Sequence, residues 1–156
     1  NKPVHTPSVK EIASDFGIPT IKRQPNQYLF YGGPVNLNKV MVLHTTDMDF
    51  GAGTHKFNDE VWLSNNPDCL NAVLKHGVAS PTNWMICIGS CTWSAGQLEA
   101  EILSRNGRMN TDAWLVTSLN ANTVFGMKYQ NRWKKTVNRI AQEQFRRTFN
   151  HAVQTQ

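Results

Sequence analysis

The chain has 156 residues, of which 40% are hydrophobic and 17% charged. This length and composition are typical of one globular domain with an apolar core, and they exclude a low-complexity or disordered chain. No apolar run approaches the ~20 residues that a membrane-spanning helix needs.

The cysteines and the first residues of the chain indicate in which cellular compartment the protein lies and whether it binds a metal ion. Cys69, Cys87 and Cys91 are odd in number and lack the paired spacing of a metal site or a disulfide scaffold. The first ten residues lack the apolar stretch of a signal peptide. We therefore expect a cytoplasmic protein with reduced thiols, no bound metal and no cofactor.

Taken in chain order, apolar periodicity and turn residues predict interspersed helices and strands. The expected elements are a helix at 8–16, strands at 28–31, 40–44 and 60–64, a helix at 66–76, a strand at 84–88, a helix at 95–105, a strand at 113–118 and a helix at 129–153. Ser8 with Glu11, and Ser94 with Gln97, have the spacing of helix capping boxes. The uneven connections favour an α+β fold over a doubly wound sheet.

The stretch from Ile88 to Ile102 reads as a strand end, a tight loop and a helix start. Its Trp93, Gly96-Gln97-Leu98-Glu99 and Glu101-Ile102 resemble the signature of the YqgE/AlgH family of small bacterial proteins. Further motifs match that family in the expected order, namely Asn1-Lys2-Pro3, Gly32-Gly33-Pro34-Val35, Leu43-His44-Thr45, Trp114 and Arg132-Trp133.

The resemblance implies a fold and a general role. The fold would be a complex α+β single domain, spanning residues 1–156, with a curled, partly barrel-like sheet flanked by helices and a long C-terminal helix. Family members carry two more strands before the Asn-Lys-Pro motif, so the chain is expected to be shortened at its N-terminus. They are often labelled transcriptional regulators, although no helix-turn-helix is recognisable in this sequence.

The family motifs define a candidate ligand site. The glycines could present backbone N–H groups to an anion or form a tight turn, and His44 could be a general base or a packed histidine at a sheet edge. Trp93 could stack on a ring-shaped ligand or close the core, while Gln97 and Glu99 could reach toward the glycine loop and His44 or only complement the helix N-terminus. The site comprises Asn1, Lys2, Pro3, Gly32, Gly33, Pro34, His44, Trp93, Gln97 and Glu99.

The C-terminal helix concentrates the charge of the chain. Between Lys128 and Arg147 seven residues are basic and only Glu143 is acidic, which leaves the rest of the chain near neutrality. An apolar face of Trp133, Val137, Ile140 and Ala141 is expected to face the core, which disfavours a membrane-surface role. The basic residues either form a solvated face or contact nucleic acid or an acidic partner through Lys128, Arg132, Lys135, Arg139, Arg146 and Arg147.

No recognised catalytic motif is present, so the catalytic residues are unknown and the chain is not expected to be an enzyme. We expect a regulatory or interaction protein that acts through protein or nucleic-acid contacts, with an unidentified protein as the favoured partner and nucleic acid as a candidate for the basic helix. The alternative is a small-ligand-binding protein, or an enzyme of unknown reaction, that uses the Gly-Gly-Pro loop, His44 and the Trp93/Gln97/Glu99 cluster.

Overall fold

The computed structural model describes residues 2–4, 6–19, 28–45, 49–76, 84–103, 114–115 and 117–154. The chain separates into two compact units. We call Asn1–Cys91 with Leu119–Tyr129 the sheet unit, and Thr92–Ser118 with Gln130–Gln156 the helix unit. The expectation of a single domain over residues 1–156 stays a prediction.

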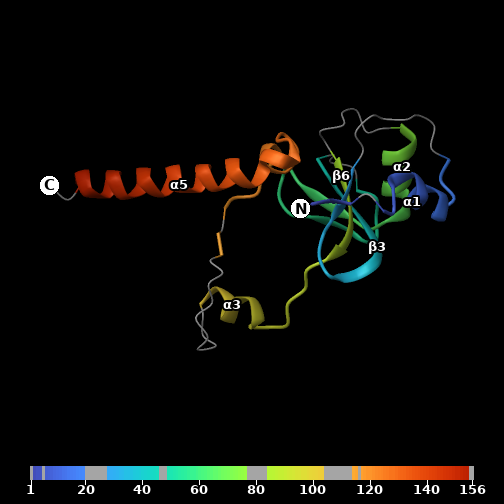
Figure 1. Cartoon of the computed structure of the whole chain (residues 1–156), viewed down its shortest axis with the longest axis horizontal. Coiled ribbons are helices and arrows are strands. Elements are labelled where there is room, and N and C mark those ends of the chain that lie inside the picture. Colours follow the sequence, from blue (N-terminus) through green and yellow to red (C-terminus); the bar gives the residue numbers. More distant parts are fainter. Residues whose placement is uncertain are drawn as a thin grey trace. The chain divides into compact units, whose positions relative to one another are not determined.

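The sheet unit is built on a mixed sheet of six strands in the order β1-β2-β6-β3-β5-β4. Figure 1 labels two of them, β3 and β6. Strand β2 pairs in parallel with β6, and the other neighbours are antiparallel. The apolar run of β6 lies between β2 and β3, where only its last residue escapes burial. The strands are β1 (Pro3–Val4), β2 (Leu29–Tyr31), β3 (Val35–His44), β4 (Thr54–Lys56), β5 (Trp62–Ser64) and β6 (Trp84–Ser90).

Two helices, α1 (Val9–Asp15) and α2 (Pro67–His76), pack against one face of this sheet. Because side chains alternate along a strand, Trp84, Ile86 and Ile88 of β6 all point to this face. The main core is formed there, from Val9, Ile12, Ala13, Ile18, Leu29, Val42, Cys69, Leu70, Val73, Leu74, Trp84, Ile86 and Ile88.

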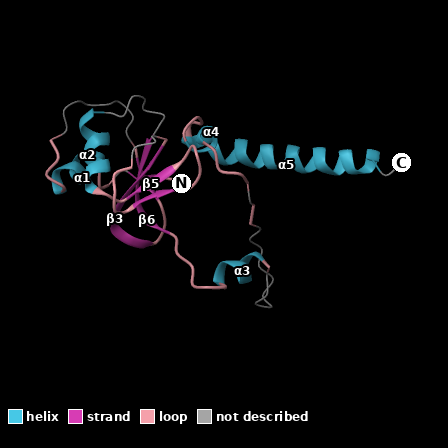
Figure 2. Cartoon of the chain, turned by 180° about the vertical axis from the view of Figure 1, so that it is seen from behind, coloured by secondary structure: helices cyan, strands magenta, loops and turns pink. Residues whose placement is uncertain are grey.

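The opposite face carries a smaller cluster around Phe30, Met85 and Cys87. Val124 and Phe125 cover it together with Tyr129. The first two lie at the end of the short helix α4 (Ala121–Val124), which is labelled in Figure 2. Tyr129 packs edge to face on both Tyr28 and Phe30. Helices therefore flank the sheet, as expected.

The position of α4 is fixed by polar contacts with the loop between β4 and β5. The amide of Asn58 donates to the Leu119 carbonyl at 2.8 Å, and the Glu60 carboxylate accepts from the Ala121 N–H at 2.7 Å. Asn120 caps the helix by accepting from the Thr123 N–H at 2.8 Å. The contacts of Glu60 and Asn120 satisfy N–H groups that a short helix leaves without intrahelical partners.

The helix unit contains α3 (Gln97–Ile102) and nearly all of α5 (Tyr129–Gln154). Helix α3 buries none of its residues, whereas α5 runs for 26 residues. Among the described residues no helix is both long and apolar enough to span a bilayer.

The α+β class is confirmed, but the sheet is open, with β1 and β4 at its edges, so its partly barrel-like character is not confirmed. Strand β3 begins at Val35, before the expected residue 40, and its register with β6 shifts between Val35 and Val40, where Asn36 has φ 54°. The strand expected at 113–118 is wrong for its described residues, since Trp114 packs on Trp93 in the helix unit instead of pairing in a sheet.

Candidate functional site

The Gly-Gly-Pro loop fits tightly against the end of β6. The Gly32 N–H donates to the Ile88 carbonyl at 2.8 Å, and a Cβ atom on Gly32 would overlap the Gly89 carbonyl oxygen. Gly89 has φ +70°, and a Cβ atom there would overlap the Gly33 carbonyl. The glycines thus permit close approach of two backbones, which accounts for this motif without a ligand.

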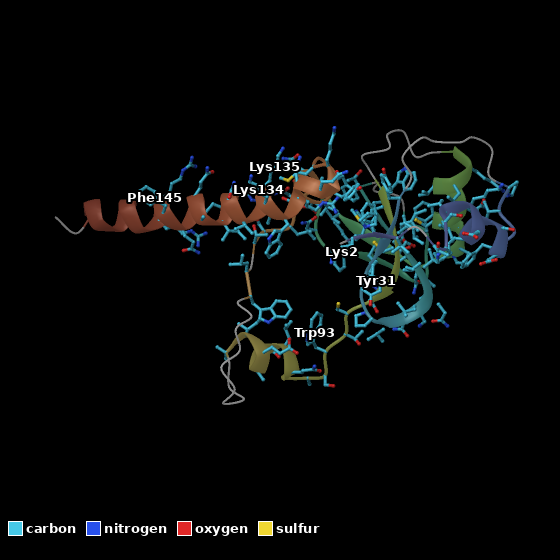
Figure 3. All side chains as sticks on the ribbon, viewed as in Figure 1. Lys2, Tyr31, Trp93, Lys134, Lys135 and Phe145 are labelled. Carbon is cyan, nitrogen blue, oxygen red and sulfur yellow. The ribbon has the colours of Figure 1, made fainter. Side chains whose placement is uncertain are left out.

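The Asn-Lys-Pro motif lies beside the same loop. Pro3 pairs with Phe30, and the Lys2 carbonyl accepts from the Tyr31 N–H at 2.9 Å, one residue before Gly32. Figure 3 labels Lys2 and Tyr31, both exposed. The structure therefore brings two of the predicted motifs together, with Pro34 exposed next to them, while Asn1 lies outside the described residues.

His44 lies at the other end of the sheet. It pairs with Trp84 at the start of β6, whereas Val35, beside the glycine loop, pairs with Ser90 at the end of β6. Its side chain is fully buried, with ring contacts to Phe50 at 5.6 Å and to Trp62 at 6.4 Å. The expectation of a sheet-edge position is wrong, because β5 and β6 flank β3 on both sides at His44. This placement favours a packing role.

Trp93 belongs to a hydrogen-bonded cluster within the helix unit. Its indole N–H donates to one oxygen of the Glu101 carboxylate at 3.3 Å, and the Gln97 amide donates to the other at 3.3 Å. The Gln97 side-chain oxygen accepts from the Ser94 N–H at 3.0 Å. The ring of Trp114 stands edge to face against Trp93, with centroids 5.9 Å apart and planes at 69°.

This cluster differs from the sequence prediction in its helix N-cap and in the acidic residue that approaches Trp93. The helix begins at Gln97 with Gly96 as N-cap at φ +77°, so Ser94 is not the N-cap and only the Gln97 half of its capping box forms. Glu101, not Glu99, approaches Trp93, because residues two apart on a helix point in different directions. The four-residue spacing of Gln97 and Glu101 could have indicated that their side chains meet on the helix. No local pattern could have indicated the contact between Trp93 and Trp114.

Helix α5 exposes cationic and aromatic side chains together. Lys134, Lys135 and Phe145, labelled in Figure 3, are exposed, and so are the basic residues Lys128, Arg146 and Arg147. Trp133 and Phe145 are 73% and 72% exposed, so the expectation that Trp133 and Ala141 face a core is wrong. Only Val137 and Ile140 of that predicted face are half-buried.

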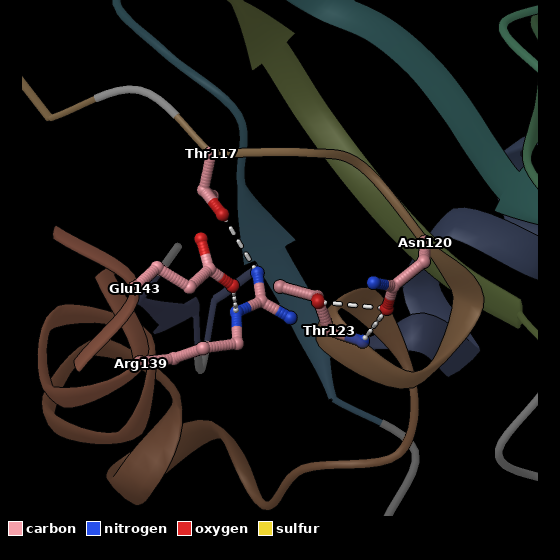
Figure 4. Close-up of polar contacts among 5 residues, drawn as sticks. All are labelled: Thr117, Asn120, Thr123, Arg139 and Glu143. Carbon is pink, nitrogen blue, oxygen red and sulfur yellow. Dashed lines mark hydrogen bonds and ion pairs between the residues drawn. The ribbon is translucent and has the colours of Figure 1, made fainter. Parts of the chain in front are cut away.

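Two arginines of the predicted contact set are less available. Arg139 donates to the Thr117 hydroxyl at 2.8 Å and lies 3.8 Å from the Glu143 carboxylate (Figure 4). Arg132 is half-buried. The exposed basic residues of α5 are therefore Lys134, Lys135, Arg146 and Arg147, and Lys134 was missing from the predicted contact set. Lys128, also exposed, belongs to the sheet unit.

The thiols differ in their surroundings. Burial raises the pKa of Cys69 to about 11, partly opposed by a hydrogen bond from Ser64. Cys91 is exposed and lies 3.6 Å from the Gly32 carbonyl oxygen. Within the described ranges, no group of three or more His, Cys, Asp or Glu side chains is placed to hold a metal ion.

Comparison with known proteins gives consistent results. An AlgH-like family model (DUF179) matches residues 1–144. A UPF0301 protein of Pasteurella multocida is 27% identical over 129 residues, which cover 81% of this chain and 64% of the relative. A UPF0301 protein of Xanthomonas axonopodis pv. citri is 29% identical over 139 residues, which cover 88% of this chain and 69% of the relative. The chain thus spans just under two thirds of the length of the Pasteurella relative.

A solved structure shares the fold. The solution structure of the AlgH protein from Pseudomonas aeruginosa aligns with a TM-score of 0.64 at 23% identity, over 90% of this chain and 69% of that one. At this identity the likeness concerns the fold alone, and the function has to be argued from the residues of this chain.

Proposed function

The chain belongs to the AlgH-like family, and from that premise we propose that it is a regulatory interaction protein that binds an acidic partner protein through α5. Family membership accounts for the fold and leaves the partner open. The whole argument for a partner therefore rests on the surface of α5.

One observation carries the proposal, namely the exposure of large aromatic side chains among uncompensated positive charges. Trp133 and Phe145 are nearly three-quarters exposed, and Lys134, Lys135 and Arg146 are exposed beside them in the sequence. Between residues 128 and 147 only Glu143 is acidic, and it pairs with Arg139. A surface with this charge attracts an acidic partner and repels a second copy of itself.

The spacing along α5 fits a groove in a protein. Trp133, Val137, Ala141 and Phe145 follow one another at intervals of four residues, which makes one ridge about 18 Å long. Aromatic anchors on such a ridge are typical of a helix that lies in an apolar groove. Binding to duplex nucleic acid would require phosphate contacts instead, and Arg139 is already held by Thr117 and Glu143.

The test compares two double variants with the same change in net charge. Lys135→Glu/Arg146→Glu reverses exposed charges on α5, whereas Lys10→Glu/Lys39→Glu reverses exposed charges on α1 and β3. Each variant and the wild type would capture proteins from host lysate with and without nuclease treatment, and the captured protein would then be purified and titrated. We expect the α5 variant to bind at least about tenfold more weakly, because charge complementarity is lost, and the control variant to bind like the wild type.

A third double variant, Trp133→Ala/Phe145→Ala, tests the contribution of the aromatic side chains to binding separately from that of the charges. Loss of two interface aromatics should weaken binding by at least about 2 kcal/mol with little change in salt dependence. Equal binding by all variants would show that α5 is not the surface that binds the partner. Capture that disappears on nuclease treatment would replace the protein partner with nucleic acid.

A further inference from the structure

Trp93 and Trp114 meet edge to face in the helix unit, and we call the angle between their ring faces the corner, with the two rings as its walls. Both side chains are partly exposed, at 38% and 44%, so solvent reaches the rings. Their planes meet at 69°, and their centroids are 5.9 Å apart. A single group placed in this corner can lie within about 6 Å of both ring centroids, the distance over which a cation is attracted to an aromatic face.

The orientation of the corner is fixed by hydrogen bonds. Glu101 accepts from the Trp93 indole N–H, and Gln97 holds the other oxygen of the same carboxylate. Gln97 is itself tied to the Ser94 N–H. The Trp93 ring, labelled in Figure 3, is therefore held in place before any ligand arrives, which lowers the entropy cost of binding.

The charge that contacts Trp93 is negative, because the Glu101 carboxylate accepts from the indole N–H. From Thr92 to Leu103 the chain carries Glu99 and Glu101 and no basic residue, while Arg105, Arg108 and Asp112, which precede Trp114, lie outside the described residues. A carboxylate at the edge of Trp93 adds to the negative potential of the indole faces, so a positive ligand is favoured over a neutral or anionic one.

We propose that the corner formed by Trp93 and Trp114, with Glu101 beside it, binds a quaternary ammonium group. Both oxygens of Glu101 already accept hydrogen bonds, so the corner offers charge and π faces in place of a dedicated acceptor. That combination suits a cation without N–H donors, as in aromatic cages. The proposal is independent of α5, because no residue of the corner belongs to that helix.

The full-length chain would be titrated with choline, while its tryptophan indole N–H signals are followed by NMR. The neutral isostere 3,3-dimethylbutan-1-ol serves as the matched ligand, since it has the same shape without the charge. We expect saturable shifts of the Trp93 and Trp114 signals with choline, with a dissociation constant in the millimolar range, and at least about fivefold weaker binding of the isostere. Equal binding of the two ligands, or no saturable shift with choline, would overturn the proposal.

Two pairs of variants test the residues. Glu101→Gln keeps an acceptor for the Trp93 indole and removes the charge, whereas Glu99→Gln makes the same charge change at an exposed side chain on the same helix. Trp114→Leu removes one wall, and Leu115→Ala alters its exposed neighbour. We expect choline binding to weaken several-fold in the first variant of each pair and to be retained in the second. Equal loss within a pair would show a general electrostatic or folding effect and would contradict the proposal.

Discussion

At the scale of single residues, Gly89 is a position where the described backbone is tightly constrained. It combines φ +70° with a backbone carbonyl, that of Gly33, where a Cβ atom would lie. Gly17 has a similar φ of +65°, but open space surrounds its Cα. Alanine at either position pays the cost of a left-handed backbone, and only at Gly89 does it also force two backbone segments apart.

We therefore expect Gly89→Ala to lower the free energy of unfolding by at least about 2 kcal/mol more than Gly17→Ala does. Urea denaturation of the two variants beside the wild type measures this difference. Equal destabilisation would mean that the glycine loop shifts freely and that its close fit to β6 does not require glycine.

Cys69 gives the protein a pH dependence in the alkaline range. Its thiol is buried and its pKa is raised from 9.0 to about 11. Since the unfolded thiol ionises first as pH rises, stability from this group is complete below about pH 9 and declines as pH rises toward 11. Between about pH 8 and about pH 10.5 the loss should reach about 2 kcal/mol.

The measurement is urea denaturation at both pH values for the wild type and Cys69→Ala. Other groups titrate in the same range, so the expected result is that the variant loses less stability than the wild type between the two pH values. Parallel losses would show that the Cys69 thiol does not titrate differently in the folded protein.

At the scale of elements, α1 depends on a reciprocal cap. Ser8 accepts from the Glu11 N–H at 3.2 Å, and Glu11 accepts from the Ser8 N–H at 2.6 Å, which also lowers the pKa of Glu11. Ser8→Ala should cost about 1 kcal/mol of unfolding free energy, since an N-terminal donor loses its acceptor. Ser14→Ala, an exposed substitution in the same helix, should be neutral or slightly stabilising. Thermal unfolding compares the two, and an equal effect would contradict a special role for the cap.

The elements that were predictable from sequence are those whose information is local. The capping box of α1, the apolar run of β6 and the periodicity of α2 each lie within a dozen residues, and each element formed nearly as predicted. Helix α4 was missed because four residues give no period, and because its position depends on Glu60 and Asn58, which are distant in sequence. The extra length of β3 lies before a register shift with β6, which apolar periodicity does not encode.

The candidate site was less predictable for the same reason. The sequence placed His44 near the glycine loop, but strand register decides which end of the sheet a residue occupies, and it separates the two along β6. Trp114 follows Trp93 by 21 residues, so a contact between them has no local signature. The polarity of individual residues could be read from the sequence, whereas their grouping depended on long-range contacts.

At the scale of the whole molecule, the structure distributes stability unevenly. The buried core lies in the sheet unit, where β6 contributes Trp84, Met85, Ile86, Cys87 and Ile88. Helix α3, in the helix unit, has six residues, none of them buried, and its N-cap, Gly96, provides no side-chain acceptor. Helices this short are not stable on their own, so α3 depends on the few contacts around Trp93 and Glu101.

Amide hydrogen exchange should reveal this difference. We expect the amides of β6 to exchange at least about a hundredfold more slowly than those of α3, because β6 opens only with the sheet whereas α3 can open locally. Peptide-resolved mass spectrometry measures both segments in one experiment. If choline binds at the Trp93 corner, protection of α3 should rise on its addition while that of β6 stays constant. Equal protection of the two segments without ligand would show instead that α3 unfolds only together with the sheet, and its stability would then have to come from more than the contacts of Trp93 and Glu101.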